Sequence, residues 1–354
     1  MYNKINKRFM KKQHTTNISV ALCTYNGQDY INEQISSILS QTKKVDEIVI
    51  CDDCSSDNTV QIIKRIQKKY PNLIRLYQNK NNKGYRKNFD DCYRMCKGEY
   101  VFSCDQDDIW NKNKVEKIMN SFKKDTVLVF TDAALIDKNG KEIGQSLWEN
   151  LGIEYKTICN IEEYKRTIKK RFVVTGATMA FRKSMYNQVN VCEYTCEHDA
   201  LIAFVAPIFG NVVALNEKLT KYRRHGKNTT VIGPINKEAP IKKRTISEKL
   251  KLNFTHIKGN GRYFRFECPL IMLKPVYNIT KNHNDAYSNS YNEEYSYFNS
   301  LFKMSKMNRL LSVVYLTIFI CNKNNRRGYK KYKPFETIPI IKDYTYFLLA
   351  RDYQ

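Results

Sequence analysis

The sequence lacks the short motifs that mark the common phosphate-binding and metal-binding sites. Neither GxGxxG nor GxxxxGK[ST] occurs in its 354 residues, so neither dinucleotide binding nor a P-loop is supported. Its 11 cysteines are scattered and do not show the spacing of a zinc site. They are most simply read as reduced thiols, which are typical of a cytoplasmic protein.

Long apolar segments are also missing. The longest apolar run, Leu310 to Cys321, has about a dozen residues, whereas a helix needs roughly 20 to cross a bilayer of about 30 Å. Residues 1–16 are polar and basic, without the apolar centre of a signal peptide. We therefore expect a cytoplasmic protein without a membrane-spanning helix.

Acidic residues are few relative to basic ones. The formal net charge is +25, and about half of this excess lies after residue 236. A field of this sign suits nucleic acid, an anionic membrane face or a phosphate-bearing substrate. The run 310–321 precedes a basic cluster at residues 323–333, a pattern that suits an anionic membrane surface. The alternative is a core helix whose basic neighbours are solvated.

Short apolar runs alternate with segments of helical spacing in the first part of the chain. The runs predict buried strands, and the alternation predicts a mostly parallel sheet with helices on both faces. The predicted strands are residues 18–23, 47–51, 74–77 and 100–103, and the predicted helices are residues 29–41, 59–71 and 87–95. Further strands are predicted at 127–130 and 212–215, a hairpin turn at 137–140 and a helix near 200–207. Residues 171–176 and 178–181 lie on either side of a small Gly-Ala step.

Polar residues follow three of these strands directly. They are Thr24 and Asn26, Asp52 and Asp53, and Asp105 and Asp107. Ligands of such sheets bind at the carboxyl ends of the strands, so this coincidence predicts a nucleotide-type site. Clustered carboxylates repel one another unless a cation neutralises them, and oxygen ligands suit Mg²⁺ or Mn²⁺. Taken alone, an Asp-x-Asp sequence is more often a solvated acidic turn.

Several longer motifs occur in a characteristic order. They are CTYNG at 23–27, VICDDCSSDNT at 49–59, NKG at 82–84 with NF at 88–89, DQDDIW at 105–110, TGAT at 175–178, EHD at 197–199 and YRRHG at 222–226. Together they resemble the family-2 glycosyltransferases over residues 17–230. The forms DQDDIW and YRRHGKN look most like the rhamnosyltransferase-type branch.

The resemblance implies a GT-A fold over residues 17–230, the nucleotide-diphospho-sugar transferase fold with a mostly parallel, mixed sheet. Residues 231–354 are predicted to form a basic, mainly helical C-terminal region. The implied activity is inverting, metal-dependent transfer of a sugar from a dTDP- or UDP-sugar to a hydroxyl of a glycan or lipid-linked glycan. No nucleic acid partner is expected.

The same resemblance assigns roles to individual residues. Asp199 matches the position of the catalytic base, and a helix N-terminal acid is the alternative for it. The expected Mn²⁺ or Mg²⁺ ligands are Asp107, Asp105 and His225. The expected donor-binding residues are Thr24, Tyr25, Asn26, Asp52, Asp53, Lys83, Asn88 and Asp105. A carboxylate at Asp52 or Asp53 would accept the imide N–H of a pyrimidine.

One position departs from the family pattern, which has glycine in the turn after the paired aspartates. This chain has Cys54 there. Glycine adopts positive φ angles at low cost and cysteine does not, so the geometry of this turn needs examination.

Two other functions compete with this reading. A nucleic-acid-binding function would explain the positive net charge, but no RNA-binding signature occurs. It would also leave the aspartates at the strand ends unexplained. A nucleotidyltransferase would also use a metal and strand-end acids. It would usually carry a glycine-rich loop near its first strand, where residues 22–27 contain one glycine.

Overall fold

The computed structural model describes residues 17–168, 173–189 and 197–225, together with a few residues between 277 and 296. The described residues from 17 to 225 belong to one of two units into which the contacts divide the chain. Nearly all of the predicted C-terminal region, 231–354, lies outside the described residues. The division into domains at residue 230 therefore stays a prediction.

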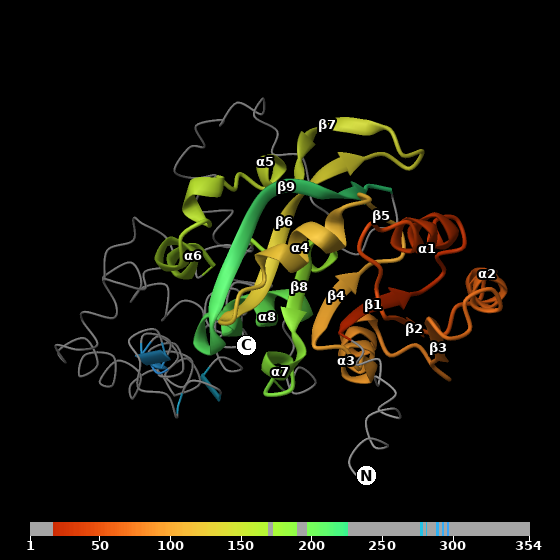
Figure 1. The fold of residues 1–354 in the computed structure, drawn as a ribbon, viewed down its shortest axis with the longest axis horizontal. Coiled ribbons are helices and arrows are strands. Elements are labelled where there is room, and N and C mark those ends of the chain that lie inside the picture. The colour runs from red at the N-terminus through yellow and green to blue at the C-terminus, as the bar shows by residue number, and fades with distance from the viewer. Residues whose placement is uncertain are drawn as a thin grey trace, which may run out of the picture. The chain divides into compact units, whose positions relative to one another are not determined.

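Strands and helices alternate in the first unit as expected (Figure 1). In chain order its first half contains β1 (Ile18–Thr24), α1 (Ile31–Leu39), β2 (Glu47–Asp52), α2 (Thr59–Gln67), β3 (Ile74–Gln78), α3 (Tyr85–Met95), β4 (Tyr100–Cys104), β5 (Ile109–Trp110) and α4 (Lys114–Ser121). Its second half contains β6 (Thr126–Ile136), β7 (Glu142–Ser146), α5 (Leu147–Asn150), the 3₁₀ helix η1 (Tyr155–Thr157), α6 (Ile161–Ile168), the 3₁₀ helix η2 (Gly176–Thr178), β8 (Met179–Arg182), α7 (Lys183–Tyr186), α8 (His198–Phe209) and β9 (Asn211–Arg223).

The strands form one mixed sheet in the order β3-β2-β1-β4-β8-β6-β9-β5, with β7 paired to β6. β3, β2, β1 and β4 are parallel neighbours. β8 runs antiparallel to both β4 and β6, whereas β6 and β9 are parallel. The predicted mostly parallel, mixed sheet of the GT-A fold is thus confirmed.

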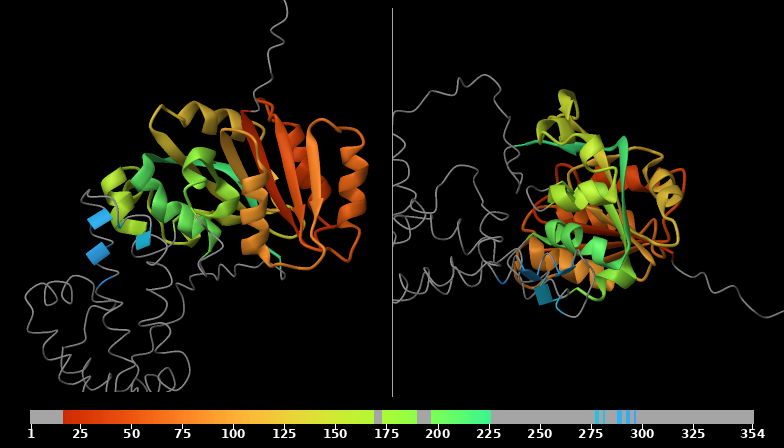
Figure 2. Two further views of the ribbon diagram at one scale, coloured as in Figure 1. Left: turned by 90° about the horizontal axis from the view of Figure 1, so that it is seen from below. Right: turned by 90° about the vertical axis from the view of Figure 1, so that its left-hand side faces the viewer.

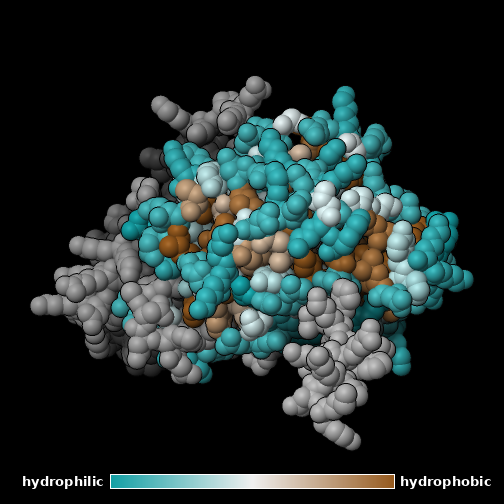
Figure 3. Space-filling model, viewed as in Figure 1, coloured by the Kyte–Doolittle hydropathy of each residue, from teal (hydrophilic) through white to brown (hydrophobic). Residues whose placement is uncertain are grey.

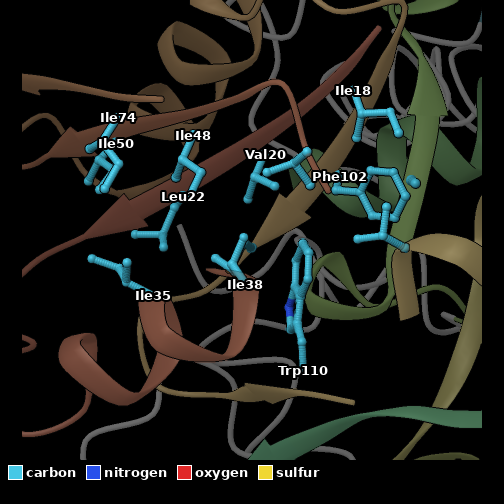
Figure 4. Packing of buried hydrophobic residues seen from close by; sticks show 14 of the residues in the cluster. Ile18, Val20, Leu22, Ile35, Ile38, Ile48, Ile50, Ile74, Phe102 and Trp110 are labelled. Atoms are coloured by element: carbon cyan, nitrogen blue, oxygen red, sulfur yellow. The ribbon is translucent and has the colours of Figure 1, made fainter. Parts of the chain in front are cut away.

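Helices cover both faces of the sheet (Figure 2). On one face, α1, α2 and α4 pack on alternate side chains of β1, β2 and β4, and Figure 4 shows this core. On the other face lies α3, whose Cys92 thiol is 3.4 Å from the carbonyl oxygen of Val49 in β2. Because both faces are covered, all seven residues of β1 are buried, which explains why the strand is mostly apolar and does not alternate with exposed polar residues.

The predicted strands and helices are found, with differences at their ends. The predicted strand 212–215 is the start of the thirteen-residue β9, and the helix expected near 200–207 is α8. The two-residue β5 was not predicted, because so short a strand has no periodicity to detect. Pairing with β9 extends the chain there.

The surface of the first unit is largely hydrophilic. Figure 3 shows hydrophobic residues in gaps between hydrophilic side chains on one face. The large hydrophobic residues that are clearly exposed in the described part lie on separate elements: Tyr25, Tyr70, Tyr77, Met95, Ile143 and Tyr155. No helix in that part is long and apolar enough to cross a membrane.

The turn after β2 is strained at Cys54, the position where the family pattern has glycine. Cys54 has a φ of +67°, in the left-handed region that favours glycine. Its thiol is exposed and lies 3.7 Å from the carbonyl oxygen of Lys80. Cys51 and Cys54 have CxxC spacing, but both are free thiols, one buried in β2 and the other exposed.

This geometry predicts how substitutions at Cys54 affect stability. Cys54→Val should lower the free energy of unfolding by about 1–2 kcal/mol, because a β-branched side chain is poorly tolerated at positive φ. Cys54→Gly should lie within about 1 kcal/mol of the wild type, since relief of strain offsets the greater freedom of the unfolded chain. Urea denaturation measures both.

Cys159 supplies a matched control for the Cys54 variants. It is also exposed, its thiol lies 3.7 Å from the carbonyl oxygen of Lys156, and its φ is not positive. Cys159→Val should therefore be nearly neutral. Equal losses from the two valine substitutions would contradict a specific effect of the positive φ.

Candidate active site

The carboxyl ends of β1 and β2 are joined by hydrogen bonds among the predicted donor-binding residues. Thr24 and Asp52 are register neighbours, and the Thr24 hydroxyl donates to Asp52 Oδ1 over 2.8 Å. The backbone N–H and hydroxyl of Ser55 also donate to Asp52, over 2.9 and 2.5 Å. Thr24 and Asp52 are both buried, so their polar groups organise the turn that follows β2.

Asp53 holds the loop that leads into α3. Its Oδ1 accepts from Asn79 Nδ2 and from the Lys83 backbone N–H, and its Oδ2 accepts from the Gly84 backbone N–H, each over 2.8 Å. Asp53 is 3% exposed and Asp52 is fully buried. Both predicted base-binding carboxylates are therefore engaged by donors of the protein itself.

Lys83 and Asn88, also predicted at the donor site, have partners within the protein. The Lys83 ammonium forms an ion pair with Asp91 over 2.8 Å. Asn88 is buried, donates from Nδ2 to the carbonyl oxygen of Cys51 over 2.8 Å and accepts from Asn79. Asn88 thus fixes α3 against the end of β2.

Tyr25, another predicted donor-site residue, is 49% exposed. Its backbone N–H donates to Gln106 Oε1 over 2.8 Å, and its carbonyl oxygen accepts from Gln106 Nε2 over 3.0 Å. These two bonds tie the end of β1 to the loop that carries the acids. Next to it, Asn26 has a φ of +48° and accepts from the Ser56 N–H over 2.9 Å.

The acids after β4 form a cluster in which the carboxylates raise one another's pKa. Burial raises the pKa of the Asp105 carboxyl, and the charges of Asp107 and Asp199 raise it further. Burial and the charges of Asp107 and Asp105 likewise raise the pKa of Asp108. One oxygen of Asp108, Oδ2, is buried without a hydrogen-bond partner.

The fold brings His225 to this cluster from the end of β9. His225 Nε2 lies 2.8 Å from Asp107 Oδ2, and both side chains are mostly buried. Two of the three predicted metal ligands are therefore in direct contact, although they are 118 residues apart in the chain.

Asp105, Asp107 and His225 fit a divalent cation whose remaining ligands are phosphate oxygens of the bound substrate. Within the described ranges, no three His, Cys, Asp or Glu side chains form a ready-made cage. Mg²⁺ is typically bound by one or two carboxylates plus substrate phosphates, so a full protein cage is not required. The raised pKa of Asp105 and the unpartnered oxygen of Asp108 both indicate a place where a cation would be stabilised.

Asp199 lies in the first turn of α8 and faces the same site. Its Oδ2 accepts from the Gly176 backbone N–H over 3.0 Å, and its Oδ1 accepts from the Ala200 N–H over 2.8 Å. Its charge acts on Asp105, so the predicted base and the predicted metal ligands share one electrostatic environment. Asp199 is thus a helix N-terminal acid, and it also lies next to the predicted metal ligands.

Buried Lys114 is an important residue that the sequence did not reveal. Its Nζ donates to the carbonyl oxygen of Ala177 over 2.8 Å and to Thr220 Oγ1 over 2.9 Å, and it lies 4.1 Å from the centre of the Trp110 ring. Burial lowers the pKa of Lys114 to about 8, while the nearby acids favour its charge. A lysine in a helix is usually solvated, so no local signal marks this one.

Comparisons with known proteins identify the family of this chain. The model of the family described as "Glycosyl transferase family 2" matches residues 19–189. The dTDP-rhamnosyl transferase RfbG of Shigella flexneri is 31% identical over 219 residues, which cover 58% of this chain and 72% of RfbG. The chain belongs to glycosyl transferase family 2. It is therefore a glycosyltransferase, and the predicted family is confirmed.

Other relatives of this glycosyltransferase support the same assignment. An uncharacterized glycosyltransferase of Nostoc sp. is 30% identical over 222 residues, which cover 60% of this chain and 66% of that protein. The crystal structure of residues 1–349 of S. aureus TarS in complex with UDP-GlcNAc aligns with a TM-score of 0.53 and 16% identity. That alignment covers 95% of this chain and 90% of the TarS fragment, and it shows the fold alone.

His198 precedes Asp199 and is a buried histidine whose titration should make the stability of the glycosyltransferase depend on pH. It stacks on Phe89 with ring centres 4.1 Å apart, and both of its ring nitrogens are buried without hydrogen-bond partners. Glu197, on its other side, pairs with Arg86 over 2.7 Å. Burial is the main cause that lowers the pKa of His198 below its ordinary value of 6.5.

The lowered pKa predicts a loss of stability in acid. As the pH falls through 6.5, the unfolded chain takes up a proton at His198 and the folded protein does not, so the free energy of unfolding decreases. His198→Leu removes this contribution, and its stability should change less between pH 7 and pH 5 than that of the wild type. Urea denaturation at several pH values tests this, and parallel pH profiles would contradict it.

Proposed function

We propose that the protein is an inverting, metal-dependent glycosyltransferase that builds bacterial surface glycans. It moves a sugar, with rhamnose as one candidate, from a nucleotide-diphospho-sugar to a hydroxyl of a growing capsule, O-antigen or cell-wall polysaccharide. The observation that carries this proposal is the contact of Asp107 with His225, next to Asp105, whose carboxyl feels the charges of Asp107 and Asp199. One site then holds groups for the diphosphate and a base for the acceptor.

The chain's own residues have distinct tasks at the departing diphosphate. A bound Mn²⁺ or Mg²⁺ would neutralise the charge that develops as the sugar leaves. Asp107 and His225 would hold this ion, because their side chains already meet at 2.8 Å. Asp105 would contact the ribose or the ion, and its raised pKa favours either a cation or a hydroxyl next to it.

Asp199 is proposed as the base on the acceptor side. The acceptor hydroxyl oxygen bonds to the anomeric carbon while the bond from that carbon to the diphosphate oxygen breaks. The hydroxyl proton passes to the Asp199 carboxylate, and the nucleoside diphosphate leaves. The Gly176 and Ala200 N–H groups each donate to one oxygen of Asp199, which keeps the carboxylate in place and leaves lone pairs for the proton.

The donor is proposed to carry a pyrimidine base, as in a dTDP- or UDP-sugar. The relative RfbG, a dTDP-rhamnosyl transferase, supports this. The exposed ring of Tyr25 also offers a surface on which a base can stack. Direct acceptance of the imide N–H by Asp52 or Asp53 would require one of their present donors to move. Tighter binding of GDP than of UDP and dTDP in calorimetry would refute the pyrimidine donor.

The acceptor is proposed to be a glycan or lipid-linked glycan, with the enzyme in the cytoplasm at the inner face of the membrane. The support is the run 310–321 and the basic cluster 323–333, both of which lie outside the described residues. Equal binding to neutral and anionic vesicles in flotation would count against this location.

The first test of the chemistry removes one charge at the cation site. Asp107→Asn should lower the turnover number by about 100-fold or more, because a preorganised group at the diphosphate is lost. The Asn side chain has the same size, so the thermal midpoint should change little. Turnover is measured with and without Mn²⁺. Full activity of the wild type in excess chelator would refute the metal requirement.

Asp125 provides the control for Asp107→Asn. It precedes β6 at the opposite end of the sheet and bonds to Asn211, before β9 reaches the site. Asp125→Asn should leave both turnover and the Mn²⁺ requirement unchanged.

The second test separates the base from donor binding. Asp199→Asn should lower transfer by about 10²–10⁴-fold, the usual contribution of a general base. Its affinity for the nucleotide should remain within a few-fold, because the base acts on the acceptor. Single-turnover transfer and calorimetry with UDP measure the two effects. Lost nucleotide binding with normal transfer would mean that Asp199 is structural.

A further inference from the structure

Arg223 is a buried arginine that the proposed chemistry does not use. It is the last residue of β9 and is 2% exposed. Burying a guanidinium is costly unless its hydrogen bonds are satisfied, so the contacts of such a residue indicate what it does. Those contacts lead to the acid cluster.

Arg223 holds the acid loop at two points, the main chain of Asp107 and the side chain of Asp108. Its guanidinium Nε donates to the carbonyl oxygen of Asp107 over 2.7 Å, and its backbone N–H donates to Asp108 Oδ1 over 3.0 Å. The position of the Asp107 main chain is thus fixed by one residue of β9.

The other end of the guanidinium is anchored on two further segments. Nη2 forms an ion pair with Glu33 of α1 over 2.5 Å, and Nη1 donates to the carbonyl oxygen of Lys138, in the turn after β6, over 3.1 Å. An arginine can make these bonds at once because its donors form a rigid planar fork. Lysine, with a single ammonium, cannot reach all of these acceptors.

The same residue also fixes His225. The guanidinium carbon lies 4.7 Å from the centre of the Tyr30 ring, and Tyr30 stacks on the His225 ring with 5.1 Å between their centres. Arg223, Tyr30 and His225 therefore form a stack, and Asp107 meets His225 at the end of it. Both proposed ion ligands are held by contacts that pass through Arg223.

We propose that Arg223 is the positioning residue of the cation and diphosphate site, holding Asp107 and His225 so that both face one ion. This inference rests on the proposed function. It assigns Arg223 no contact with substrate. It requires that an altered guanidinium weaken ion binding even when the fold survives.

The experiment compares Arg223→Lys with a matched arginine. Arg182 at the end of β8 also donates to two carbonyl oxygens, those of Thr126 and Lys123, and lies over the ring of Tyr100, but it is far from the acid cluster in the sheet. Calorimetry measures the affinity of each full-length variant for Mn²⁺ in the presence of UDP. Arg223→Lys should weaken Mn²⁺ binding about tenfold or more, and Arg182→Lys should change it less than twofold.

Hydrogen exchange of the metal-free protein gives a second readout. Amides in residues 105–110 should exchange faster in Arg223→Lys than in the wild type, with no such change in Arg182→Lys. If Arg223→Lys does not fold, Glu33→Ala replaces it, because Glu33 is 55% exposed on its side chain and its loss frees only one end of the guanidinium. Glu33→Ala should weaken Mn²⁺ binding by a few-fold.

The outcomes separate this inference from the proposed function. Wild-type affinity for Mn²⁺ in Arg223→Lys, or in Glu33→Ala if the former is unfolded, overturns the role of Arg223 and leaves the proposed function intact. If the wild type itself binds no Mn²⁺ in the presence of UDP, both the metal-dependent function and the role of Arg223 are refuted.

Discussion

Repulsion among carboxylates that are partly removed from water is the constraint on which the active site depends. Asp105, Asp107, Asp108 and Asp199 all act on buried Tyr222, whose pKa is raised first by burial and then by their charges. Such a group of acids would be expelled to solvent or protonated unless the structure balanced it. The Lys114 ammonium and backbone N–H groups supply part of that balance.

The balancing groups come from elements that are distant in the chain. Lys114 in α4 places an ammonium near Asp105 and Asp108, and it bonds to the carbonyl oxygen of Ala177. The preceding residue, Gly176, donates its N–H to Asp199. A side chain at Gly176 would come within 3.0 Å of His198 Nε2, so glycine allows this close approach. The acid loop and Asp199 are thereby coupled through the packing between them.

The structure also gives the polar residues at the ends of β1 and β2 a structural role. Asp52 and Asp53 are engaged by Thr24, Ser55 and the N–H groups of Lys83 and Gly84. Both carboxylates thus order the loops that follow β2 and lead into α3. Carboxylates accept several N–H bonds at once, and such buried bonds are expensive to lose. A motif can therefore mark a binding site through residues that build its walls.

The sequence by itself determined the family, the alternation of strands and helices, and the edge of the sheet where the site lies. Periodicity and strand-end residues are local signals, and β1, β2 and β4 place Thr24, Asp52 and Asp105 at one edge because they are parallel neighbours. Only the tertiary structure decided which groups touch. The contact of His225 with Asp107 and the burial of Lys114 and Arg223 depend on β9 crossing the sheet. Contacts between residues about a hundred positions apart leave no periodic trace in one sequence, because they arise from packing.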